Sequence, residues 1–89
     1  MKNKKIFGTF FREKPAMMLV HLYASSTEIY ASSLAKVVDC TYSHVVKILQ
    51  DMQRANIVEF KKQGRLKIIV LTEKGKTLAK HVEEIRKVL

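Results

Sequence analysis

Residues 32–49, which read SSLAKVVDCTYSHVVKIL, decide the fold of this sequence. Ser32 or Ser33 can cap a helix that runs through Val38, because a hydroxyl accepts hydrogen bonds from the free backbone N–H groups of a helix start. The segment Asp39-Cys40-Thr41 ends that helix and offers the Thr41 hydroxyl as the cap of the next one. The stretch therefore predicts two helices joined by a three-residue turn.

The second of these helices is predicted over about residues 42–55 and is amphipathic. Its apolar residues follow the i, i+3, i+4, i+7 spacing of a buried face and are Val45, Ile48, Leu49 and Met52. Its other residues are mostly polar: Tyr42, Ser43, His44, Lys47, Gln50, Asp51 and Arg54. A helix with such donors and acceptors fits the major groove of duplex DNA, where each base pair presents a distinct hydrogen-bonding pattern.

A basic β-hairpin is predicted directly after this helix. From Ile57 the pattern changes to strand-like alternation over residues 58–62, and Gln63-Gly64-Arg65 is a turn before a returning strand over residues 66–71. No acidic residue lies between Phe60 and Leu71. The basic residues of the hairpin are Lys61, Lys62, Arg65 and Lys67. Such a hairpin is suited to the phosphate backbone or the minor groove of DNA.

The flanking segments predict two further helices and a brief strand. Pro15 indicates the start of a first helix that runs to about Ser25, and residues 28–30 are β-rich enough for a brief strand. Thr72 would cap a last helix that continues to Leu89. The first helix is expected to bury Met18, Leu19, Leu22 and Tyr23, and the second Leu34, Val37 and Val38. A heptad-like seam on the last helix contains Leu78, Val82, Ile85 and Leu89.

Composition narrows the class of protein. The chain has 89 residues and carries 17 Lys and Arg against 8 Asp and Glu, which gives a formal charge of +9. This excess of positive charge favours nucleic acid as the partner, and an anionic membrane surface is the second choice. This length excludes a two-domain enzyme. One cysteine excludes an internal disulfide, so a reducing cytoplasm is the expected location. No apolar run approaches the roughly 18 residues of a membrane span. The apolar run of residues 6–11 is also too short for a signal peptide.

With these features the chain resembles the winged helix-turn-helix transcription regulators of bacteria and archaea, particularly the small MarR-like and ArsR-like forms. The resemblance covers about Pro15 to Gly75. It is carried by residues 33–36, 41–52, 55–58 and 71–75, which read SLAK, TYSHVVKILQDM, ANIV and LTEKG. Asn56 stands where the family usually has Gly, and both residue types tolerate the left-handed conformation at a helix end.

The resemblance implies an α+β, mainly helical fold with a three-helix core, a β-wing of two to three strands and a C-terminal helix. It also implies DNA contacts along the third helix and the wing. The predicted DNA-binding residues are Thr41, Tyr42, Ser43, His44, Val46, Lys47, Lys61, Lys62, Arg65 and Lys67. Val46 has two readings of equal weight, an exposed side chain that touches thymine methyl groups or a half-buried one at the edge of the core stripe.

No catalytic, metal or cofactor site is predicted. Cys40 and His44 are four residues apart and, with Asp39, hint at a metal site, but structural zinc needs four ligands and catalytic zinc three, and the other histidines have no such neighbours. The chain has no Gly-rich phosphate loop and no Ser/His/Asp set in a supporting context. We therefore expect neither an enzyme nor a small-molecule substrate.

One domain is expected over residues 1–89, with a basic and aromatic arm at 1–13 and a C-terminal helix at 73–89. A homodimer is expected to use that helix or the aromatic patch formed by Ile6, Phe7, Phe10 and Phe11, while Lys2, Lys4 and Lys5 would add phosphate contacts. The alternative is that the patch covers the chain's own first and last helices.

The sequence therefore predicts a cytoplasmic, sequence-specific regulator of transcription that binds double-stranded DNA. The rival is a winged-helix module for protein interaction or assembly, against which the excess positive charge argues. RNA ranks last, because an A-form major groove is too narrow for a recognition helix.

Overall fold

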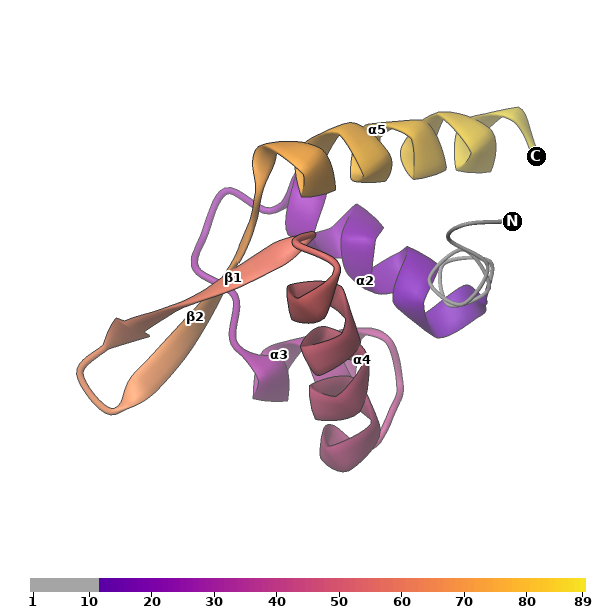
Figure 1. Ribbon diagram of the computed structural model, residues 1–89. Helices are drawn as coiled ribbons and strands as arrows, with labels where there is room; N and C mark the ends of the chain where they lie inside the picture. The colour runs from indigo at the N-terminus through magenta and orange to yellow at the C-terminus, as the bar shows by residue number, and fades with distance from the viewer. Residues whose placement is uncertain (1–11) are drawn as a thin grey trace.

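The computed structural model describes residues 12–89, which form four helices and one antiparallel two-stranded sheet (Figure 1). In chain order these are α2 (Glu13–Ala24), α3 (Ala31–Val37), α4 (Tyr42–Arg54), β1 (Val58–Gln63), β2 (Leu66–Leu71) and α5 (Glu73–Val88). α5 packs along α2, α4 packs on α3, and the β1–β2 hairpin extends away from the helices (Figure 1). The expected α+β, mainly helical winged architecture is confirmed. The residues expected to form the aromatic patch and its neighbouring lysines lie outside the described part.

The helix starts differ by a few residues from the prediction. α2 begins at Glu13, so Pro15 stands within the first turn, where the N–H that proline lacks has no partner inside the helix. α3 begins at Ala31 after Tyr30, and Ser33 stabilises this start from inside the helix by accepting from the Tyr30 N–H at 3.2 Å. The prediction that Ser32 or Ser33 stands at the N-cap is therefore wrong, because Tyr30 occupies that position and Ser33 supports the helix start from its first turn.

The turn between α3 and α4 has the predicted chemistry. Asp39 adopts a left-handed conformation with φ of 53°, which aspartate tolerates better than most residues. Thr41 is the N-cap of α4, and its hydroxyl oxygen accepts from the His44 N–H at 3.2 Å. Asn56, after α4, has φ of 63°, in agreement with its expected role at a helix end.

The core lies where the helices and the inner part of the sheet meet. All four predicted residues of the α4 stripe are buried, as are Met18, Leu19, Leu22, Leu34 and Val38. Two predicted core residues are wrong: the exposed fraction is 43% for Tyr23 and 54% for Val37. On α3, Leu34, Ala35 and Val38 share an arc of about 100°, and Val37 falls outside it. Tyr23 stands at the edge of its stripe in the last turn of α2, beside an open groove.

The hairpin formed by residues 58–71 is called the wing below. Its strands pair antiparallel from Val58 opposite Leu71 to Gln63 opposite Leu66. Gln63, predicted in the turn, belongs to β1, so the connection consists of Gly64 and Arg65 alone, with Gly64 at φ of 64°. A two-residue hairpin connection needs positive φ, which glycine adopts without strain.

The brief strand predicted at residues 28–30 is not formed. Only one backbone hydrogen bond joins this segment to β2, from the Ile69 N–H to the Ile29 carbonyl oxygen at 2.9 Å. The chain enters α3 directly afterwards, with Tyr30 as N-cap, so it leaves the edge of β2 before a ladder can build up. The wing therefore has two strands.

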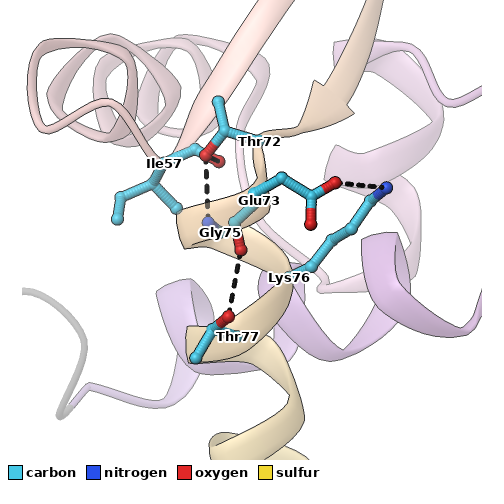
Figure 2. A network of polar contacts seen from close by, with 6 residues as sticks. All are labelled: Ile57, Thr72, Glu73, Gly75, Lys76 and Thr77. Atoms are coloured by element: carbon cyan, nitrogen blue, oxygen red, sulfur yellow. Dashed lines mark hydrogen bonds and ion pairs between the residues drawn. The ribbon is translucent and has the colours of Figure 1, made fainter.

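A polar junction joins the end of the wing to α5 (Figure 2). Thr72 caps α5 as predicted: its Oγ1 accepts from the Gly75 N–H at 3.0 Å and donates to the Asn56 carbonyl oxygen at 2.7 Å. Gly75 is buried against Ile57, and a Cβ at this position would overlap the Ile57 carbonyl oxygen. The junction holds α4, the wing and α5 together at one point.

The seam predicted on α5 packs over only part of its length. Leu78 and Val82 are partly buried against the core, together with the fully buried Ala79. Ile85 and Leu89 are exposed, with exposed fractions of 52% and 98%. No helix within residues 12–89 has the length and apolar character needed to span a membrane.

Candidate nucleic-acid interface

The outer face of α4 presents the polar residues that the sequence assigns to DNA contact. Thr41, Tyr42, Ser43, His44 and Lys47 are all exposed, and 59% of Tyr42 is accessible. These residues lie in the first two turns of the helix, the part that reaches base edges when such a helix docks in a major groove. Val46 is half-buried at the edge of the core stripe.

The four basic residues of the wing are exposed, but they do not share one face. Lys62 stands opposite Lys67 and Lys61 opposite Ile68. Because successive side chains of a strand point to opposite faces, Lys62 and Lys67 lie on the face of Phe60 and Lys61 lies on the other. Sequence reasoning grouped these lysines by charge, whereas the strand register separates them.

A groove of about 430 Å³ lies between α4 and the wing. Tyr42 and Val46 line it from the helix, and Arg65 and Lys67 line it from the wing tip and β2. The remaining lining is largely apolar and includes Tyr30, Leu49, Phe60, Leu66 and Ile69. Four of the ten predicted residues thus converge on one concave surface from two elements that are distant in sequence.

Few of the cations in this region are neutralised within the chain. The ion pairs among residues 12–89 join Arg54 to Asp51 at 2.9 Å, Lys76 to Glu73 at 3.5 Å and Arg86 to Glu83 at 2.7 Å. The last pair lowers the pKa of the Glu83 carboxyl, chiefly through the hydrogen bonds from Arg86. The lysines of α4 and of the wing, and Arg65, take no part in these pairs, so their charge is available to a polyanion.

Two further lysines hold the helices in place, and sequence reasoning missed both. Lys14 of α2 donates to the Val38 carbonyl oxygen at 2.6 Å, at the end of α3. Lys74 of α5 donates to the Ala55 carbonyl oxygen at 2.9 Å, at the end of α4. Cations at helix C-termini satisfy free carbonyls and interact favourably with the helix dipole. Because each lysine comes from another element, no local sequence pattern reveals this role.

The hinted metal site has no further ligand in the described part of the chain. Cys40 is a free, half-buried cysteine packed against the core, next to the cap of α4. Residues 12–89 contain no cluster of three or more His, Cys, Asp or Glu side chains that could hold a metal ion.

Comparison with known proteins identifies the family. The family of winged helix DNA-binding domains matches residues 13–75, from the start of α2 to the junction at Gly75. The chain belongs to this family. The match includes α4, the wing and every predicted DNA-binding residue.

Similar proteins are found in archaea and bacteria. An uncharacterised protein of Archaeoglobus fulgidus is 32% identical over 88 residues, which cover 96% of this chain and 92% of that protein. The crystal structure of AF1382 from Archaeoglobus fulgidus has a TM-score of 0.83 at 29% identity, covering 94% of this chain and 96% of the other.

The larger regulator MepR, a transcription regulator of the Staphylococcus aureus multidrug efflux pump MepA, shares the fold. Its TM-score is 0.80 at 22% identity, and the match covers 93% of this chain but 63% of MepR. A MarR family regulator from Silicibacter pomeroyi has a TM-score of 0.79 at 20% identity, covering 97% of this chain and 62% of the other. The predicted winged helix-turn-helix of the MarR-like kind is thereby confirmed as the fold of this chain.

Proposed function

We propose that this winged-helix protein is a cytoplasmic transcription regulator that binds a specific sequence of double-stranded DNA as a homodimer. The observation that carries the proposal is the groove between α4 and the wing, where Tyr42 and Val46 meet Arg65 and Lys67. A helix that reads bases and a cationic strand pair must face the same side to engage one duplex. The convergence of these four side chains supports that geometry.

In this proposal α4 lies in the major groove. Ser43, His44 and Lys47 are exposed near the helix start and supply the donors and acceptors that distinguish base pairs. Thr41 and Tyr42 stand at the first turn, where hydroxyl groups contact backbone phosphates in many such complexes. Val46 reaches thymine methyl groups only through its exposed part, so its contribution to sequence preference is smaller.

The wing supplies most of the affinity by contacting the flanking backbone. Arg65 and Lys67 line the groove beside α4, Lys62 lies on the same face of the wing as Lys67, and Lys61 reaches a phosphate from the opposite face of the hairpin. Each neutralised phosphate releases condensed counterions, so binding weakens as salt increases. A crystal structure of a MepR–DNA complex, whose MepR chain has a TM-score of 0.78 at 21% identity, covering 97% of this chain and 73% of the other, supports DNA as the partner of this fold.

The homodimer is supported by the exposed apolar end of α5. Ile85, Val88 and Leu89 have exposed fractions of 52%, 86% and 98%, and burying them against a second copy would remove apolar surface from water. A two-fold symmetric dimer would meet two half-sites about one helical turn, ~34 Å, apart. The binding site would then be palindromic.

The proposal is tested by selecting bound fragments from genomic DNA with the purified protein and measuring affinity for the enriched sequence by fluorescence anisotropy. We expect a palindromic motif, at least about a thousandfold preference over unrelated DNA, and a log–log salt slope of about −5 to −9 for roughly six to ten phosphates. A flat salt response without enrichment would refute the proposal and favour the protein-interaction module.

A further inference from the structure

The outer half of the wing, residues 61–67, is exposed on both faces. The inner half is held by the burial of Val58, Ile69 and Leu71 and by the single backbone hydrogen bond between Ile69 and Ile29. Arg65 and Lys67 both stand on the outer half. Their position relative to α4 therefore depends on whatever restrains the hairpin beyond Ile69.

Glu28 provides such a restraint. The side-chain amide of Gln63, the last residue of β1, lies against the Glu28 carboxylate. Its nearest atom stands 2.6 Å from Oε2 and 3.2 Å from Oε1, and we assign this atom as the amide nitrogen. The nitrogen faces the carboxylate because both carboxylate oxygens are acceptors and only the NH₂ group can donate to them. Gln63 pairs with Leu66, three residues along β2 from Ile69, so this contact lies about 10 Å further toward the tip than the backbone bond.

The same carboxylate is tied to the start of α3. The Tyr30 hydroxyl donates to Glu28 Oε2 at 3.1 Å, and this hydrogen bond is the main reason why the pKa of Tyr30 is raised. Tyr30 is the N-cap of α3, and its backbone N–H donates to Ser33. Glu28 thus joins the wing near its tip to the first helix of the helix-turn-helix.

We infer that Glu28 is a positioning residue that fixes the angle of the wing relative to α3 and α4, so that Arg65 and Lys67 face the same groove as Tyr42. Gln63 alternates with Lys62 along β1, so the contact lies on the face of the wing away from Lys62 and Lys67. Glu28 restrains the hairpin from the face opposite Lys62 and Lys67 and is not part of the groove between α4 and the wing. The effect on DNA affinity rests on the proposed function, whereas the restraint itself does not.

Whether a substitution of Glu28 strengthens or weakens DNA binding distinguishes this positioning role from a simple effect of net charge. Removing an acid from a DNA-binding protein normally strengthens binding, because the net charge becomes more positive. Glu59 is the matched control: it lies on the same face of the wing, is exposed, and has no side-chain hydrogen bond or ion pair within residues 12–89. Glu28→Ala and Glu59→Ala change the charge equally.

The first experiment measures DNA affinity at fixed salt. We expect Glu59→Ala to bind as tightly as the wild type or tighter, and Glu28→Ala to bind about two- to five-fold more weakly, the range of a lost exposed polar contact. Glu28→Gln keeps an acceptor oxygen and should restore wild-type affinity. If Glu28→Ala binds as tightly as Glu59→Ala, Glu28 does not position the wing.

The second experiment needs no DNA and is hydrogen exchange of the backbone amides of residues 63–68. Exchange should be faster in Glu28→Ala and in Gln63→Ala, unchanged in Glu59→Ala, and no faster in the Glu28→Ala/Gln63→Ala double variant than in either single one. Unchanged exchange in both single variants overturns the inference. Should the wild type bind no DNA while these exchange differences persist, the proposed function fails and the restraint stands.

Discussion

At the scale of the residue, Gly75 shows how a single side-chain position fixes the path of the chain. It lies in the first turn of α5, capped by Thr72, with its Cα against the backbone of Ile57 (Figure 2). A backbone carbonyl cannot move aside as a flexible side chain does. Glycine is needed here for close approach, whereas Gly64 at the wing tip is needed for its positive φ.

Gly75→Ala should destabilise the protein by about 1–3 kcal/mol, as overpacking does. The sign is informative, because a glycine-to-alanine change inside a helix otherwise stabilises it by roughly 1 kcal/mol. Lys80→Ala, at an exposed position of the same helix, is the control and should be close to neutral. Urea unfolding followed by circular dichroism checks both, and a Gly75→Ala variant as stable as the wild type would contradict the close packing at Ile57.

At the scale of the element, α3 and α4 each receive, at their C-terminal end, a hydrogen bond from a lysine of another helix. Lys14 bonds the carbonyl of Val38, and Lys74 bonds that of Ala55. These two lysines bond backbone carbonyl groups at helix ends, so they are used within the protein. The basic residues of this chain therefore divide into structural lysines and lysines free to bind DNA.

Lys14→Met should lower the free energy of unfolding by about 0.5–1.5 kcal/mol through loss of its hydrogen bond, and should leave the salt slope of DNA binding unchanged. Lys80→Met, at an exposed position of α5, should change stability by less than about 0.5 kcal/mol. The measurements are thermal unfolding and a salt titration of DNA affinity. A smaller slope in Lys14→Met would mean that Lys14 contacts phosphate after all.

The lysines of the wing should affect DNA binding and leave the stability of the protein nearly unchanged, the opposite of Lys14. Lys62→Gln should weaken binding to all DNA sequences alike and reduce the salt slope by about one per bound subunit. Its effect on the free energy of unfolding should be small, because the Lys62 side chain is exposed to solvent. Lys80→Gln, at an exposed position in the middle of α5, removes the same charge away from both the groove and the proposed dimer interface and serves as control. Equal slopes for the two variants would count against the wing as the backbone contact.

At the scale of the whole molecule, the two ends of α5 have different surroundings. The first turn is locked to the wing and α4 through Thr72 and Gly75, whereas Ile85 and the residues after it are exposed (Figure 1). A second copy seated on this exposed end would lie away from the groove between α4 and the wing. DNA binding and self-association would then use separate surfaces.

Ile85→Glu should shift the protein from dimer to monomer in sedimentation velocity, because the charge would be buried without a partner in the dimer interface. Affinity for a palindromic site should fall while the unfolding free energy of the monomer changes little, since Ile85 is half exposed. Thr77→Glu introduces the same charge near the other end of α5 as control. Dimers that persist in Ile85→Glu would exclude this end of α5 as the interface.

The sequence by itself determined the helices, the turn between α3 and α4 and the hairpin, because these depend on local causes. Side-chain periodicity marks the α4 stripe, the Thr41 hydroxyl bonds an N–H three residues away, and Gly64 supplies the positive φ of a two-residue turn. The segment at residues 28–30 and the exposed Val37 were predicted wrongly, because whether a β-rich or apolar residue pairs or is buried depends on what lies next to it.

Only the tertiary structure decided which cations act together and which are used internally. Lys61 and Lys62 are neighbours in sequence but lie on opposite faces of the wing, and Lys14 meets a carbonyl 24 residues away. The contact of Glu28 with Gln63 likewise joins a loop to a strand with two helices between them. Such contacts depend on the angles at which elements pack, and those angles come from the filling of a shared core rather than from any local run of residues.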